Sequence, residues 1–220
     1  QRGLKPSRWD SDAAAAVATL LAAQAAIGLS SVVRLPFLID GLGQAGYGLY
    51  FTLGNITPIL LTTGAGMRIA ARTFVAEGQA GASAAARAFG ASLGISAFIG
   101  LAEVLALAPL AFLPLHRWLG AADVVSHGQV VAVLLVTALL ASAATPGGAA
   151  LGKLEADGRQ ATVHLVIGGV AIVGLAATIA LLHWTQDFVL VASLNVVTTV
   201  APFYIAWVLE WRGSAGEGRM

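Results

Sequence analysis

The chain has 220 residues, of which 58% are hydrophobic and only 10% are charged, and its mean hydropathy is +0.83. A soluble domain carries about 25% charged residues, so this composition predicts a membrane protein. The net charge is +1 and no basic cluster stands out, which excludes a nucleic-acid-binding protein. Cysteine is absent, so disulfide frameworks, thiolate metal sites and cysteine nucleophiles are excluded as well.

Long apolar runs without strand-like alternation predict an all-α membrane bundle of six transmembrane helices. A polar segment, residues 1–12, precedes the transmembrane domain, residues 13–211, and a tail, residues 212–220, follows it. The six spans are expected at about residues 13–39, 47–71, 88–113, 130–151, 163–182 and 188–209. A glycine-rich turn, residues 40–46, joins the first two spans into a hairpin. The spacings Gly90–Gly94 and Gly148–Gly152 predict close helix packing in spans three and four.

The positive charges predict how the bundle is oriented. All but two of the 12 Lys and Arg residues fall in the N-terminal segment, the loops after spans two and four, and the tail. The exceptions are Arg117, in a loop on the other side, and Arg34, inside the first span. The positive-inside rule then places both termini in the cytoplasm. The tryptophans lie at or near predicted span ends, as an interfacial aromatic belt does.

Arg34 is the most informative ionisable residue, because it lies about five residues, or about 8 Å, inside the end of the first span. Its planar guanidinium has the geometry to bind a phosphate or diphosphate group. An equally good interpretation is structural, with Arg34 reaching out to the interface or pairing with a carboxylate. The expected partner is Glu103 in the third span, for which a structural ion pair is favoured over proton or cation coupling.

Other polar residues within the spans are candidates for lining a cavity, although hydrogen bonding between helices explains them better. The candidates are Gln24, Asn55 and Asn195. The sequence contains no H-E-x-x-H motif, no histidine pair at helical spacing, no Walker loop and no GxSG serine motif. We therefore expect no metal, no cofactor and no catalytic residue, and a protein that is not an enzyme.

The run LGQAGYGLY, residues 42–50, resembles the turn between the first two helices of polysaccharide-export flippases, the Wzx-like members of the multidrug/oligosaccharidyl-lipid/polysaccharide (MATE-like) superfamily. In that family an arginine-bearing first helix leads to an LG…YG turn. The second helix ends in a GxG…R segment, here Gly64 to Arg68 and then Arg72. The resemblance implies the N-terminal lobe of a two-lobed transporter. Such transporters export undecaprenyl-diphosphate-linked saccharides, the precursors of lipopolysaccharide O-antigen and similar polymers, across the bacterial cytoplasmic (inner) membrane by alternating access.

The same resemblance implies roles for three arginines. Arg34 would face the lipid diphosphate, and Arg68 and Arg72 would bind substrate near the cytoplasmic opening. One lobe alone does not enclose a cavity, so we expect the chain to be part of a longer protein or to pair with a second copy. Two other functions stay open. One is a cation-coupled multidrug antiporter of the same superfamily with Glu103 as the coupling carboxylate, and the other is a non-transporting scaffold subunit of a membrane complex.

Overall fold

The computed structural model describes residues 8–78 and 82–217, and every secondary-structure element in these ranges is helical. The long helices are α1 (Arg8–Gly78), α2 (Ala82–Leu107), α4 (His127–Ala156), α5 (Gln160–Trp184) and α6 (Phe188–Glu217). A 3-10 helix, η1 (Ala108–Phe112), and a single helical turn, α3 (Leu115–Trp118), connect α2 to α4. All five long helices contain stretches that are long and apolar enough to cross a membrane. The predicted all-α fold is therefore confirmed for the described residues.

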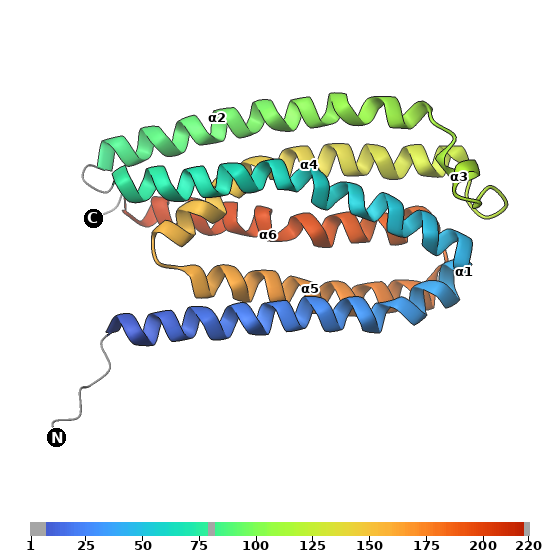
Figure 1. Cartoon of the computed structure of the whole chain (residues 1–220), viewed down its shortest axis with the longest axis horizontal. Helices are drawn as coiled ribbons and strands as arrows, with labels where there is room; N and C mark the ends of the chain where they lie inside the picture. The colour runs from blue at the N-terminus through green and yellow to red at the C-terminus, as the bar shows by residue number, and fades with distance from the viewer. Residues whose placement is uncertain (1–7, 79–81, 218–220) are drawn as a thin grey trace, which may run out of the picture.

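The first helix, α1, is a hairpin, because its backbone reverses direction at Gly43 (Figure 1). Gly43 has φ 71° and ψ 167°, a conformation that is essentially open only to glycine. We call residues 8–42 the first arm of α1 and residues 44–78 its second arm. The turn predicted over residues 40–46 is thus contracted to one residue, and helix extends up to it on both sides. The apolar stretch of α1, Ala13–Thr73, is thus divided between two arms, whereas each of the other four long helices contains one apolar stretch.

The helices run side by side along one long axis (Figure 1). The start of α1 and the end of α6 lie together at what we call the terminal end, and the reversal of α1 lies with α3 at the opposite, hairpin end. The first arm packs along α5, whereas the second arm packs along α2 and α4, with α6 between the two groups. The two arms of one helix therefore belong to different parts of the bundle.

Apolar side chains form both the core and the outer surface. At the hairpin end, a buried cluster joins the second arm, α4 and α6 through Leu49, Leu53, Val130 and Val191. The outward face of α2 is equally apolar but open, with Phe98 73% exposed and Leu105 66% exposed. A surface of this kind is costly in water, at about 25 cal/mol per Å², and is at no disadvantage against lipid chains. The fold thus fits a multi-pass membrane protein.

Small residues bring particular helices into backbone contact. A Cβ atom at Gly100 of α2 would lie 2.5 Å from the carbonyl oxygen of Ser142 in α4. A Cβ atom at Gly152 of α4 would clash with the backbone of the second arm at Arg68. The close packing predicted at Gly152 is therefore confirmed. The prediction for Gly90 and Gly94 is wrong, because both face open space and Gly100 takes over their role in α2.

Candidate functional site

A cavity of about 420 Å³ lies between the two arms of α1, α5 and α6. The cavity opens to the outside of the bundle, as the exposure of its lining residues Ser31, Phe51 and Asn55 shows. Apolar side chains such as Ile27 and Ile167 make up part of the wall. The polar side chains of the lining are Ser30, Ser31, Arg34, Asn55, Asn195, Thr198 and Thr199. One positive charge therefore stands among uncharged groups in this cavity.

Arg34 reaches the cavity from the first arm, roughly nine residues or about 13 Å from the reversal at Gly43. It lies deeper than the sequence predicts, because the first arm continues to residue 42. The Nη1 atom donates a hydrogen bond of 3.2 Å to Oδ1 of Asn195 in α6. The guanidinium also lies beside the phenol of Tyr50 and interacts with it. Its Nε atom is buried and has no hydrogen-bond partner among the described residues.

The predicted ion pair between Arg34 and Glu103 is not formed. Within the described ranges, no carboxylate forms an ion pair with Arg34. Glu103 is buried between α2 and α4, where its Oε2 atom lies 2.9 Å from Oγ1 of Thr145. The sequence placed Arg34 and Glu103 at similar depths in the membrane, but it did not reveal which helices are neighbours. The first arm packs on α5 and α6, so α2 is out of reach of Arg34.

Of the three amide side chains predicted to line the cavity, two do so and one does not. Asn195 lines the cavity, accepts the hydrogen bond from Arg34 and packs so tightly on the second arm that a Cβ atom at Gly54 would lie 2.8 Å from its Nδ2. Asn55 also lines the cavity, and its Nδ2 donates to the carbonyl oxygen of Phe51 over 2.8 Å. Gln24 is outside the lining: it is exposed, one turn of the first arm closer to the terminal end than the lining residues.

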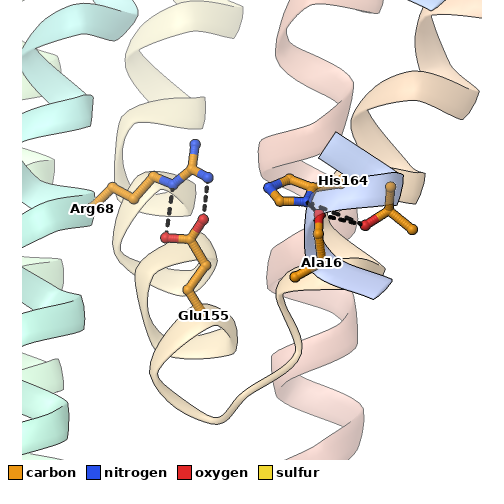
Figure 2. Close-up of polar contacts among 5 residues, drawn as sticks. Ala16, Arg68, Glu155 and His164 are labelled. Atoms are coloured by element: carbon orange, nitrogen blue, oxygen red, sulfur yellow. Dashed lines mark hydrogen bonds and ion pairs between the residues drawn. The ribbon is translucent and has the colours of Figure 1, made fainter. Parts of the chain in front are cut away.

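Arg68 does not belong to the cavity. It forms a two-pronged ion pair with Glu155 of α4, with 3.2 Å between Nε and Oε2 and a second contact between Nη2 and Oε1 (Figure 2). The carboxylate is buried, with 8% of its side chain exposed. This arrangement joins the second arm to α4 next to the close contact at Gly152, so the fork of Arg68 is already occupied. Arg72 is exposed near the same end, away from the cavity.

Further polar contacts hold the terminal end together. Lys153 of α4 forms ion pairs with Glu210 of α6 and, over 3.2 Å, with Asp157. The Nδ1 atom of His164 in α5 donates to the carbonyl oxygen of Ala16 in the first arm over 3.2 Å (Figure 2). Sequence reasoning missed Glu155 and Glu210 as partners, because acidic residues in predicted loops and at span ends are ordinarily solvated. The only signal was their position beside helix-end arginine and lysine residues.

The described residues contain no cluster of three or more potential metal-ligating side chains. No family model, no curated protein and no solved structure matches the chain. The site must therefore be interpreted from its own chemistry. A guanidinium held by two neutral groups, the amide of Asn195 and the phenol of Tyr50, with no ion-paired carboxylate among the described residues and an open cavity beside it, is suited to bind an anion.

Proposed function

We propose that the chain is one lobe of a membrane transporter that carries an anionic amphiphile across the bacterial cytoplasmic membrane. The cargo proposed is a lipid-linked saccharide with a phosphate or diphosphate head group. The observation that carries this proposal is the position of Arg34 in an open cavity, hydrogen-bonded to Asn195 and without an ion-pair partner among the described residues. A charge at such depth is costly unless it meets an opposite charge, which a bound head group would supply.

The composition of the cavity wall supports an amphiphile rather than a small inorganic anion. Phe51 and Ile167 offer apolar surface near the guanidinium, and Ser31 and Thr199 offer hydroxyl groups. A volume of about 420 Å³ accommodates a head group and leaves the rest of the cargo outside. The opening of the cavity toward the surface of the bundle gives a lipid chain a way to stay in the bilayer.

The open side of the cavity also supports a second lobe or a second copy as a partner. Ser31 and Asn55 are exposed within membrane-length helices. Both side chains donate to backbone carbonyl oxygens of their own arm, but polar side chains are still costly against lipid chains, so a facing protein surface or enclosed water suits them better. The charge pattern of the sequence supports an orientation with both termini in the cytoplasm, because ten of the 12 Lys and Arg residues fall in the segments predicted on the side of the termini and Arg117 falls on the other side.

Binding of undecaprenyl diphosphate to the full chain in lipid nanodiscs, measured by native mass spectrometry, tests this proposal. A hydrogen bond to a charged group contributes about 1.5–3 kcal/mol, so Arg34→Ala should weaken binding by about 10- to 150-fold. Arg87→Ala is the matched control, because it removes one positive charge from an exposed position outside the cavity. Equal affinities in wild type and Arg34→Ala would contradict the proposal.

A further inference from the structure

Three of the four hydroxyl groups in the cavity wall have already used their protons. The hydroxyl group of Ser31 donates to the carbonyl oxygen of Ile27 over 2.9 Å. Those of Thr198 and Thr199 donate to the carbonyl oxygen of Asn195 over 3.0 and 2.7 Å. A hydroxyl group has a single proton, so these three oxygen atoms can only accept a hydrogen bond from a molecule in the cavity.

Two backbone carbonyl groups add to these acceptors. Pro58 of the second arm and Pro202 of α6 both line the cavity. A proline has no amide proton, so the carbonyl group four residues earlier in the helix loses its usual hydrogen bond. The carbonyl groups concerned are those of Gly54 and Thr198, which line the cavity as well. Gly54 has no side chain, so it can contribute to the wall only through its backbone.

These acceptors lie next to the guanidinium of Arg34. Arg34 donates to Asn195, and Thr198 follows Asn195 by three residues, which is about 4.5 Å along α6. Helix α6 runs from the hairpin end to the terminal end, and helical carbonyl groups point along the chain direction (Figure 1). A group attached to a phosphate at Arg34 would therefore meet the carbonyl oxygen of Thr198 about one helical turn further toward the terminal end.

We propose that this part of the cavity binds the sugar that is attached to the phosphate, through the hydroxyl groups of that sugar. The proposal rests on the proposed function, in which Arg34 binds the phosphate or diphosphate. Phosphate oxygen atoms are strong acceptors, so they gain nothing from a wall of acceptors and are confined to the guanidinium. An isoprenoid chain has no protons to donate either. Sugar hydroxyl groups donate, and they can satisfy the carbonyl groups of Gly54 and Thr198.

An alkali cation is the other ligand that carbonyl and hydroxyl oxygen atoms commonly bind. The charges of this cavity disfavour it. The described lining residues include no carboxylate, and the guanidinium of Arg34 lies about one helical turn from the free carbonyl groups. A cation there would be repelled by the guanidinium, whereas a hydroxyl group donates a proton without adding a charge.

Native mass spectrometry of the full chain in nanodiscs tests the proposal with three probes. They are undecaprenyl diphosphate, the same lipid carrying one hexose, and that hexose lipid with fluorine in place of the sugar hydroxyl groups. One neutral hydrogen bond changes affinity by about 2- to 12-fold, so two should make the hexose lipid bind about 5- to 150-fold tighter than undecaprenyl diphosphate. Fluorine is compact but cannot donate, so the fluorinated lipid should lose this gain. Equal affinities for the hexose lipid and its fluorinated form would overturn the proposal.

Proline variants test the two carbonyl groups one at a time. Pro58→Ala and Pro202→Ala each supply the missing amide proton to the carbonyl group four residues earlier. Each should therefore reduce the affinity ratio between the hexose lipid and undecaprenyl diphosphate by about 2- to 12-fold. Pro146→Ala is the matched control, because it supplies an amide proton in α4, outside the cavity lining, and should leave the ratio unchanged. An unchanged ratio in either cavity variant would overturn the proposal.

Arg34→Ala separates this proposal from the proposed function. It should weaken the binding of undecaprenyl diphosphate and of the hexose lipid by the same factor, and so leave the ratio between them unchanged. If Arg34→Ala weakens neither lipid, the phosphate site is wrong. If the wild type binds both lipids equally while Arg34→Ala weakens both, the phosphate site stands and the sugar site is overturned.

Discussion

Replacing Arg68 tests whether this guanidinium holds the bundle together instead of binding cargo. The side chain of Glu155 is 8% exposed and that of Arg68 is 30% exposed. Exposed ion pairs contribute about 0.2–1 kcal/mol, whereas breaking a buried pair costs about 3–5 kcal/mol. Water reaches the arginine and screens it, so we expect Arg68→Ala to cost about 2 kcal/mol, between these limits. Glu155→Gln should cost less, about 1 kcal/mol, because Arg68 can turn to water.

Thermal unfolding of the purified chain in detergent measures these changes in stability. For a chain of 220 residues a change of 1 kcal/mol shifts Tm by about 2–4 °C, so Arg68→Ala should lower Tm by about 4–8 °C. The double variant Arg68→Ala/Glu155→Gln should be less destabilised than the sum of the single variants, because it leaves no buried charge. Arg87→Ala, at an exposed position, should stay within about 0.5 kcal/mol of the wild type. Strict additivity, or an unchanged Tm in Arg68→Ala, would refute the structural role.

The glycine positions give two further predictions for the same unfolding assay. Gly152→Ala should destabilise the protein by about 1–3 kcal/mol, because its Cβ atom clashes with the backbone at Arg68. Gly169→Ala, in open space on α5, should instead stabilise the protein by about 0.5–1 kcal/mol, because alanine has the higher helix propensity. Similar effects of Gly152→Ala and Gly169→Ala would contradict the close contact between α4 and the second arm at Gly152. Gly43→Ala should cost about 1–3 kcal/mol, because alanine is strained at φ 71° and ψ 167°. An unchanged Tm in Gly43→Ala would contradict a reversal at this residue.

The part of the fold that could be predicted from the sequence is the set of long apolar helices. Their number and the hairpin between the first two follow from length and composition, because a membrane-spanning helix needs about 20 apolar residues. The point of reversal could not be predicted. Gly41, Gly43 and Gly46 stand close together in the turn, and only the backbone conformation distinguishes Gly43 from the other two.

In the candidate site, a single unusual residue could be recognised from the sequence, whereas contacts between residues on different helices could not. Arg34 stands out because a guanidinium within an apolar run is rare. Its partner was misassigned, because depth along a helix says nothing about which helix lies beside it, and Asn195 takes the place given to Glu103. Arg68 was assigned to substrate from the family resemblance, and its partner was missed because Glu155 lies far along the chain and looks like a loop residue.

The most direct test of the cavity as an anion site is the location of a bound lipid diphosphate. A photoreactive undecaprenyl diphosphate analogue can be cross-linked to the full chain in nanodiscs, and the labelled peptides identified by mass spectrometry. The label should fall on the cavity wall, in residues 27–34 of the first arm and 195–202 of α6. It should also be displaced by unlabelled undecaprenyl diphosphate but not by undecaprenol. Labelling centred on Arg68 and Arg72, or displacement by the neutral lipid, would contradict the account.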